Sequence, residues 1–317
     1  MKLTVDLWDV GQGNSTVVTL PDGSLVLIDV GPRNSPIVEW LKRSPKNIHS
    51  IVITHNDSDH IGGLPSIVGN ASQEIKAVYL IRDPKSENPS QTFCRLIRSL
   101  EERKRQGRTE VYTLTCGVNV WQDGKCSLRV RFPDYLANFK ATYPNQTSGV
   151  LTLEDEQQVF LIWGGDAALA DIDHVCKKTN AYFLDGPHHG APQDRGLRTT
   201  EFKRLLGSIG SKRLHISVGT NNTYRHPNRD YLVAASTGGL KVTCTELTTR
   251  CVDVIPKKPI FPASALLGLP TCLSGCSCRG TTRLWIEDGK LILDTKNNDA
   301  HSQSVTNRVP HALCRKK

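Results

Sequence analysis

Several apolar runs in this sequence end in a short segment that contains aspartate or histidine. The clearest is "SIVITHNDSDHIGG", in which an apolar run is followed at once by two histidines and two aspartates. The others are "LVLIDVG", "VFLIWGGDA" and "YFLDGPHHGA". Loops at the ends of strands expose side chains that can converge on one point. This recurrence predicts a fold in which distant strand ends meet at a common site.

The residue types in these segments indicate metal chemistry. His55, Asp57, Asp59 and His60 offer imidazole and carboxylate ligands, which divalent metals accept. A polar turn would explain the aspartates but not the two histidines. One loop cannot fill the coordination spheres of two metals, so ligands from elsewhere are needed. The candidates are Asp29, Asp166 and the pair His188 and His189.

The order of the elements predicts an α/β protein. Short β-rich runs, among them "LTVDLW", "STVVTL" and "SLVLID", alternate with groups of helices, twice over. Helical patterns cover residues 35–43, 62–68, 89–106, 167–178 and 228–236. This order favours an αββα sandwich, with two packed sheets and helices on their outer faces.

Composition changes near residue 256. We interpret residues 1–255 as the main domain and 256–317 as a cysteine-containing extension, partly ordered, with a hairpin over 281–294 that turns at Asp288 and Gly289. The last residues, from 295 on, are polar and expected to be mobile. The group "CLSGCSC" with His301, His311 and Cys314 could bind zinc, but its spacing matches no common zinc pattern, and packing of the tail is the alternative.

Charge and hydropathy bound the partners. The net charge of +9 indicates an anionic partner such as nucleic acid, although solvated helix faces would also explain it. No apolar run approaches the roughly 18 residues of a membrane helix, and the N-terminal segment lacks the features of a signal peptide. We therefore expect a cytoplasmic protein without membrane contact. Ten cysteines in such a chain argue against a disulfide framework.

Together these motifs resemble the metallo-β-lactamase-fold hydrolases, and more narrowly the metallo-β-lactamase-like domain of the competence protein ComEC. The resemblance covers about residues 1–255. The matching segments, in order, are "DVGQGNS", "LIDVG", "THNDSDHIGG", "GGDA", "HHGA" and "SVGTNNTYRHP". Two departures stand out: Asn14 replaces an aspartate of the pattern, and no "strand-Gly-His" motif occurs between residues 64 and 165. Asn145 or Ser148 is expected to face the space left by the missing imidazole.

The resemblance implies a metallo-β-lactamase fold, with two central mixed β-sheets flanked by helices, and a site with two divalent ions. His55 and Asp57 would hold one ion, Asp59 and His60 the other, and Asp166 would bridge them. One of the pair His188 and His189 would complete the second site, and the sequence does not choose between them. Asp29 would support the loop from beneath. A site richer in carboxylate than in imidazole favours a harder ion, so we expect Mn²⁺ or Mg²⁺ to compete with Zn²⁺.

The implied activity is that of a phosphodiesterase or nuclease that cleaves DNA, or other nucleic acid, with a metal-activated hydroxide. A role as an effector in phage defence is a further hypothesis. Asp59 could take a proton from the nucleophile, and His226 could donate one to the leaving oxygen or clamp a phosphate. Asn222 and Arg225 stand near His226 and, like Asn14 and Asp29, are candidates for supporting the site or binding substrate. Two alternatives stay open: an ester, lactone or lactam hydrolase of the same fold, and a non-catalytic nucleic-acid-binding module. The sequence does not identify a protein partner.

Overall fold

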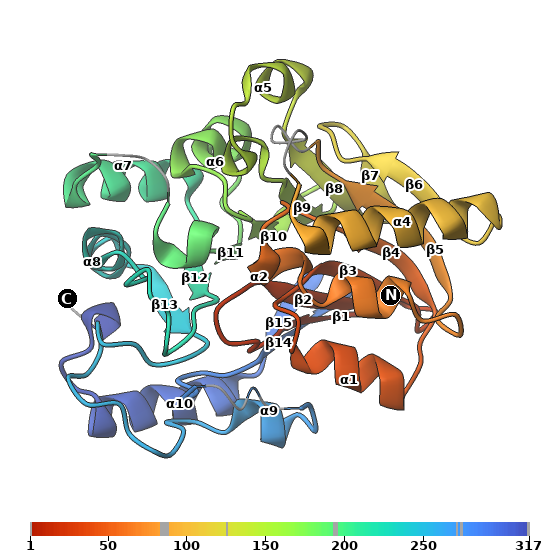
Figure 1. Ribbon diagram of the computed structural model, residues 1–317. Coiled ribbons are helices and arrows are strands. Elements are labelled where there is room, and N and C mark those ends of the chain that lie inside the picture. The colour runs from red at the N-terminus through yellow and green to blue at the C-terminus, as the bar shows by residue number, and fades with distance from the viewer. Residues whose placement is uncertain are drawn as a thin grey trace.

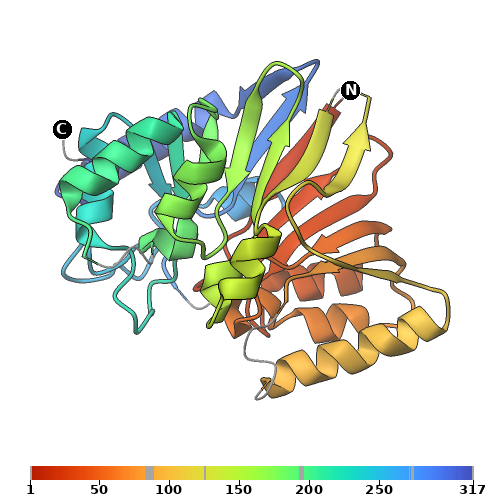
Figure 2. The ribbon, with the colours of Figure 1, turned by 90° about the horizontal axis from the view of Figure 1, so that it is seen from above.

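Two mixed β-sheets face each other at the centre of the molecule, and helices cover their outer faces (Figure 1). The computed structural model describes residues 2–82, 89–124, 126–192, 196–270, 272 and 275–315. The view from above in Figure 2 shows the two sheets side by side between the helices of the first half and those of the second. The predicted αββα architecture is confirmed.

The first sheet has eight strands in the described residues, in the order β15-β14-β1-β2-β3-β4-β5-β6. The strands β2 to β6 follow one another across it, and those from β3 onward pair in parallel. Their bounds are β1 Lys2–Leu7, β2 Ser15–Thr19, β3 Leu25–Val30, β4 Ile48–Val52, β5 Ile75–Leu80, β6 Glu110–Thr113, β14 Thr282–Glu287 and β15 Lys290–Leu293.

The second sheet has seven strands in the same part of the chain, in the order β13-β12-β11-β10-β9-β8-β7. Its strands pair antiparallel up to β10 and in parallel from β10 to β13. The bounds are β7 Asn119–Asp123, β8 Cys126–Phe132, β9 Val150–Glu154, β10 Val159–Trp163, β11 Phe183–Asp185, β12 Arg213–Ile216 and β13 Lys241–Cys244.

The helices divide between the two outer faces. Four of them, α1 to α4, pack on the first sheet through one apolar cluster, and α6 to α8 pack on the second through another. The bounds are α1 Pro36–Arg43, α2 Ser58–Ile61, α3 Leu64–Val68, α4 Gln91–Arg105, α5 Tyr135–Lys140, α6 Leu169–Cys176, α7 Thr199–Ile209, α8 Arg229–Thr237, α9 Ala263–Leu266 and α10 Thr295–Arg308. Short 3₁₀ helices lie at η1 Pro144–Thr147, η2 Pro187–Gly190 and η3 Leu313–Arg315.

Burial patterns explain why these segments form their elements. Every residue of β3 is buried, because this strand has layers on both of its faces. The strand β8 alternates instead, with Leu128 and Val130 pointing into the core and Arg129 exposed. The apolar side chains of both sheets meet between them in a third cluster, in which Val5 and Leu153 are fully buried. No helix of the described residues has the length and apolar character needed to span a membrane.

The C-terminal segment joins the first sheet. The strand β14 pairs antiparallel with β1, and β14 and β15 form a hairpin whose turn lies at Asp288 and Gly289. The expectation of a mobile tail is wrong for residues 295–308, which form α10. Most of this helix is polar, so the sequence shows little periodicity, but His301 and Val305 are buried against the rest of the segment. Packing therefore stabilises a helix that propensity alone would not reveal.

The other predicted helices have counterparts with slightly different ends. The pattern over residues 62–68 corresponds to α3, while the short helix α2, which precedes it within the first loop, was not predicted. The helix α5 has no buried residue and was not predicted, because it lacks an apolar face that would show in the sequence.

Candidate metal centre

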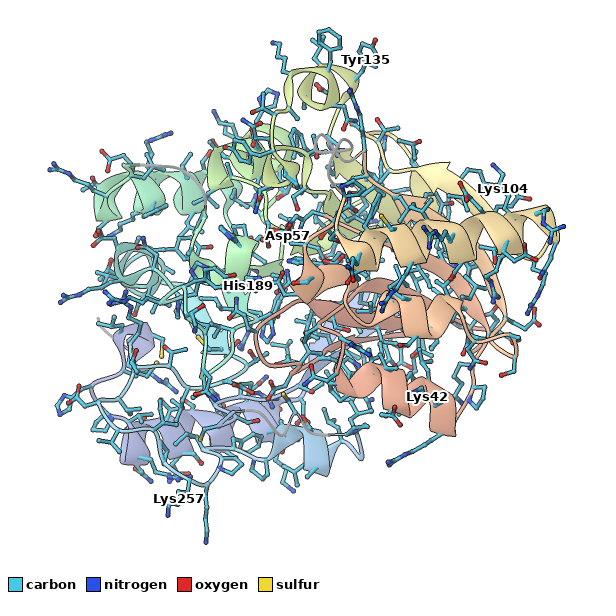
Figure 3. The ribbon with its side chains drawn as sticks, in the orientation of Figure 1. Lys42, Asp57, Lys104, Tyr135, His189 and Lys257 are labelled. Atoms are coloured by element: carbon cyan, nitrogen blue, oxygen red, sulfur yellow. The ribbon has the colours of Figure 1, made fainter. Side chains whose placement is uncertain are left out.

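The carboxyl ends of parallel strands from both sheets meet at one edge of the sandwich, as is usual for binding sites in open α/β sheets. The first loop follows β4, Asp166 follows β10, and the histidine pair follows β11. Figure 3 shows Asp57 and His189 near each other in the middle of the molecule, where the two halves meet. The predicted convergence of distant segments is what the structure shows.

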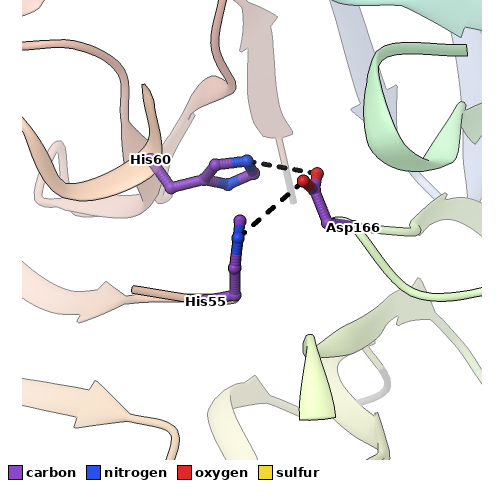
Figure 4. Close-up of side chains that lie close together, drawn as sticks. All are labelled: His55, His60 and Asp166. Atoms are coloured by element: carbon purple, nitrogen blue, oxygen red, sulfur yellow. Dashed lines mark ion pairs between the residues drawn. The ribbon is translucent and has the colours of Figure 1, made fainter. Parts of the chain in front are cut away.

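Asp166 lies at the centre of this convergence (Figure 4). Its Oδ1 atom lies 3.1 Å from Nε2 of His60 and 3.9 Å from Nε2 of His189. Its Oδ2 atom lies 3.8 Å from Nε2 of His55 and 3.6 Å from Nε2 of His188. Each oxygen of one carboxylate thus faces a different pair of imidazoles, which is the arrangement expected of a residue that bridges two ions.

The two sides are completed by the aspartates of the first loop. Asp57 Oδ2 lies 3.1 Å from Nε2 of His55, and Asp59 Oδ2 lies 3.0 Å from Nε2 of His189. Ligand atoms of His55, His60 and Asp166 all lie within 4.8 Å of one another, and so do those of Asp59, His60 and His189. His60 belongs to both groups, so the two groups adjoin and suit one ion or two neighbouring ions.

The orientation of the imidazoles leaves their Nε2 atoms available. Nδ1 of His60 bonds Asp29 Oδ2 at 2.6 Å, and Nδ1 of His189 bonds the carbonyl oxygen of Ser217 at 2.8 Å. These acceptors favour the tautomer that carries its hydrogen on Nδ1, so Nε2 of each of these two rings presents a lone pair to the site. Nε2 of His55, His60 and His189 and Oδ1 of Asp166 are buried without a hydrogen-bond partner. Buried polar atoms without partners are costly, and divalent ions would satisfy this set.

Unusual backbone conformations aim these ligands. His188 and His189 both have positive φ angles, 49° and 54°, a region that residues with side chains rarely adopt. Asp29, with φ 53°, is a third case. Strain of this kind concentrates at functional sites. Gly165 also has a positive φ, and a β-carbon there would lie 2.5 Å from Ser148 Oγ, so only glycine lets the chain place Asp166 in the site.

Burial and charge shift the ionisation of the cluster. Burial alone would raise the pKa of Asp166, but positive charge on His60, His55 and His189 outweighs it and holds the pKa well below its usual range. Burial would lower the pKa of His60, yet Asp166 and Asp29 raise it well above its usual value. The carboxylates therefore favour positive charge among them, and metal ions could replace the protons.

The support predicted for Asp29 is present in the geometry. Its Oδ1 accepts the backbone N–H of Thr54 at 2.8 Å, and Oδ2 accepts the Thr54 hydroxyl as well as Nδ1 of His60. Asn14 donates its backbone N–H to the carbonyl of Asp59 at 3.2 Å, and its own Oδ1 is buried without a partner.

The two residues named for the missing imidazole both lie beside Asp166. Asn145 Nδ2 lies 3.4 Å from Asp166 Oδ2, and Ser148 Oγ accepts the Asp166 backbone N–H at 2.7 Å. His188 reaches the Oδ2 atom of Asp166 that Asn145 also approaches, so an imidazole from the segment after β11 lies where the sequence pattern lacked one before β9.

His226 lies next to the centre. Its ring centroid is 5.1 Å from that of His188 and 6.1 Å from that of His189. Burial, together with charge on these two histidines, lowers the pKa of His226 to about 4. Asn222 shapes its loop: the side chain accepts the His226 backbone N–H at 2.8 Å and donates to the His226 carbonyl. Arg225 lies outside the cluster, in an exposed turn with φ 61°.

Sequence reasoning missed two residues beneath the centre. Ser217 orients His189 through its carbonyl, which no side-chain pattern could reveal. Asp185 is fully buried at the end of β11, where burial raises its pKa to about 7. Its position after an apolar strand in "YFLDG" was the available signal, since the other strand-end aspartates were recognised in the same way.

A third group of ligand atoms lies away from this centre and consists of Asp9, Glu246 and Cys272. Burial and the negative charge of Glu246 raise the pKa of Asp9 to about 7, so a proton on one of the two carboxyl groups suits this pair. Of the other cysteines in the C-terminal group, Cys276 and Cys278 have a different environment. Cys278 Sγ lies 3.5 Å from His301 Nε2, but within the described residues neither joins a third ligand atom closer than 4.8 Å. Cys276 and Cys278 instead pack in an apolar cluster with α10.

Comparison with family models places this geometry in a known context. Residues 8–101, which include the whole first loop, match the model of the metallo-β-lactamase superfamily. The chain has the metallo-β-lactamase fold. The superfamily match and the ligand clusters together support a metal-binding hydrolase of this fold.

Solved structures with similar folds share little sequence with this chain. Igni18, a metallo hydrolase from Ignicoccus hospitalis, is 16% identical with a TM-score of 0.49, covering 76% of this chain and 94% of that one. YhfI from Bacillus subtilis is 12% identical (TM-score 0.46; 77% and 95% covered), and the short form of human tRNase Z is 15% identical (0.44; 76% and 95%). A search of the curated proteins found no match. None of these similarities bears on the substrate.

Proposed function

We propose that this metallo-β-lactamase-fold protein is a metal-dependent phosphodiesterase that cleaves nucleic acid, with DNA as the first candidate substrate. The proposal includes its resemblance in sequence motifs to the metallo-β-lactamase-like domain of ComEC. The observation that carries the proposal is the position of Asp166, whose two carboxylate oxygens face two separate pairs of imidazole Nε2 atoms. Three of these four atoms, those of His55, His60 and His189, are buried without a hydrogen-bond partner. Zn²⁺ and Mn²⁺ are the ions of choice, with Mg²⁺ as the third.

The chain's own residues would divide the work. Nε2 atoms of His55 and His188, with Asp57, would hold one ion, and those of His60 and His189, with Asp59, the other. Two divalent ions bound there would supply an activated water and outweigh the charge of the three carboxylates, which suits an anionic phosphodiester better than a neutral ester.

Asp59 and His226 would assist the reaction through hydrogen bonds. Contacts with His189 and His60 keep the pKa of Asp59 low despite burial, so this carboxylate is ionised near pH 7 and its oxygen can accept a hydrogen bond from the attacking water and orient it. His226 is neutral near pH 7, and its ring N–H can donate a hydrogen bond to the leaving oxygen. Asn222 holds the loop that presents it.

The overall charge agrees with a nucleic-acid substrate. The net charge of +9 favours association with a polyanion, whereas a small neutral lactone gains nothing from it. We extend the proposal to a cytoplasmic enzyme.

The test is a substrate panel with matched variants. Purified protein is incubated with single-stranded and duplex DNA, RNA, bis-p-nitrophenyl phosphate and a lactone, each with Mn²⁺, Zn²⁺, Mg²⁺ or EDTA. We expect nucleic-acid cleavage that EDTA abolishes and that Asp166→Asn lowers by at least about a thousandfold, since it removes the charge shared by both ion sites. Asp123→Asn, at an exposed position far along β7, is the control for loss of one carboxylate.

Two other results would replace the proposal. Hydrolysis of the lactone alone would identify a small-molecule hydrolase. Binding of nucleic acid without hydrolysis of anything, under every metal, would identify a non-catalytic module.

A further inference from the structure

An open cavity of about 670 Å³ lies beside the candidate metal centre, at the start of α8. Its lining includes Tyr224, Arg225, His226, Arg229 and Arg250. A volume of this size is in the range that holds one nucleotide-sized ligand. His226 belongs to both places, because it lines the cavity and its ring stands 5.1 Å from that of His188. The cavity therefore adjoins the candidate metal centre through His226.

Three arginines give the cavity its chemical character. Arg225 and Arg229 are exposed, and among the lining residues only Asp230 carries a negative charge. The hydroxyl of Thr199 donates to that carboxylate at 3.0 Å, so Asp230 already has a partner. The excess of guanidinium groups favours an anion with planar or branched oxygens, such as a phosphate.

Arg250 is held in place before any ligand arrives. Its Nε and Nη2 atoms each donate to the carbonyl oxygen of Arg225 at 3.3 Å. An arginine has five N–H donors, and these two contacts are the hydrogen bonds that its guanidinium makes to other described residues, so further donors remain for an anion. Because the same carbonyl belongs to a residue in the left-handed conformation, the contact also supports the turn that carries Arg225 and His226.

Tyr224 adds an aromatic surface. It is 71% exposed, although a tyrosine of a monomeric protein usually buries most of its ring. One face of the ring stacks on His226, with centroids 5.6 Å apart and planes at 18°. A nucleobase could stack on the outer face and extend this pair, since base stacking on tyrosine is common in proteins that bind single strands.

We propose that this cavity is a subsite for one nucleotide unit of a single-stranded nucleic acid, adjacent to the scissile phosphate. Arg225, Arg229 and Arg250 bind its backbone phosphates, and Tyr224 stacks on its base. A paired base cannot offer its face to Tyr224, so the subsite selects an unpaired strand. The inference rests on the proposed phosphodiesterase function and names its substrate class.

The experiment measures binding without catalysis. Fluorescence anisotropy follows a short fluorescein-labelled oligothymidylate in EDTA, over a series of salt concentrations, for wild type and variants. Arg225→Gln/Arg229→Gln should weaken binding at least about tenfold and lower the slope of log affinity against log salt by about 1.4, because each lost phosphate contact contributes about 0.7 for a single strand. Tyr224→Ala should weaken binding about fivefold or more, whereas Tyr224→Phe should restore it.

Arg95→Gln/Arg98→Gln is the matched control for the loss of two charges, because Arg95 and Arg98 are also exposed but lie on α4, on the other outer face. An unlabelled duplex of the same sequence should compete poorly with the labelled single strand. Wild-type affinity in both the arginine and the Tyr224→Ala variants would overturn the proposal, and so would equal competition by the duplex. Because no turnover is measured, these outcomes are independent of whether the enzyme hydrolyses phosphodiesters.

Discussion

Nδ1 of His60 lies 2.6 Å from the carboxylate of Asp29, while Nε2 of the same ring lies 3.1 Å from Asp166. One histidine thus joins a buried carboxylate beneath the site to the carboxylate at its centre. The carboxylate of Asp29 determines which nitrogen of His60 carries the proton and raises the basicity of the other.

Replacing Asp29 should therefore weaken metal binding without removing a ligand. For Asp29→Asn we expect an affinity for Zn²⁺ or Mn²⁺ about 10- to 100-fold lower than that of wild type, because the neutral amide polarises the imidazole less. Competition with a chelator in calorimetric titrations measures this. Asp123→Asn should bind as wild type does, and an unchanged affinity in Asp29→Asn would contradict the role given to Asp29.

The two neighbouring histidines should hold different ions. His188 faces Oδ2 of Asp166 and His189 faces Oδ1, so His188→Ala and His189→Ala should each retain about one of two metal equivalents, and the double variant should retain neither. Elemental analysis after dialysis gives the stoichiometry. Retention of both ions by His188→Ala would show that His188 acts on substrate rather than on metal.

His226 should affect turnover and not metal content. His226→Gln removes the ring N–H near the leaving group, and we expect kcat to fall about a hundredfold or more while both metal equivalents stay bound. The exposed His174 on α6 provides the control, since His174→Gln should leave kcat unchanged. A variant at position 226 that loses its metal would assign this histidine to the ligand set instead.

Stability should fall as the pH rises through neutrality, in part because of Asp9. Burial and Glu246 raise the pKa of this carboxyl to about 7 from its usual 3.8, so the folded protein holds a proton that the unfolded chain releases. The associated stability is fully present below about pH 4 and is lost as the pH rises through 7. Asp9→Asn carries a permanent N–H donor toward Glu246 and should lose less unfolding free energy between about pH 5 and pH 8 than wild type, by up to a few kcal/mol.

Urea unfolding in EDTA across this range measures the effect. Burial also raises the pKa of Asp185 to about 7, so part of the dependence of stability on pH should remain in Asp9→Asn. Parallel stability curves for wild type and Asp9→Asn would contradict the shared-proton interpretation. The urea midpoint of unfolding is also measured after addition of Zn²⁺. If this midpoint rises for wild type and does not rise for Asp9→Asn, Asp9 and Glu246 bind a metal instead.

Much of the fold was readable from local patterns. The strand β4 and the helix α4 have strong periodicity and clear ends, so their positions in the sequence analysis hold within two residues. The helix α10 could not be predicted, because only the burial of His301 and Val305 against residues far back in the chain stabilises it. The hairpin of β14 and β15 was predicted over residues 281–294, but the pairing of β14 with β1 was not, because the two strands lie far apart in the sequence and meet only in the folded protein.

The residue types of the candidate site could be recognised in the sequence, because so many imidazole and carboxylate side chains directly after apolar strands are typical of a metal site. What the sequence could not supply was the pairing of atoms. Only the folded backbone, with its left-handed turn at His188 and His189, decides that these neighbours face different oxygens of Asp166. Likewise, the cavity beside His226 has walls from separate segments. Tyr224 comes from the loop between β12 and α8, Arg229 from the start of α8, and Arg250 from the segment after β13. Contacts between such segments depend on tertiary packing rather than on local sequence.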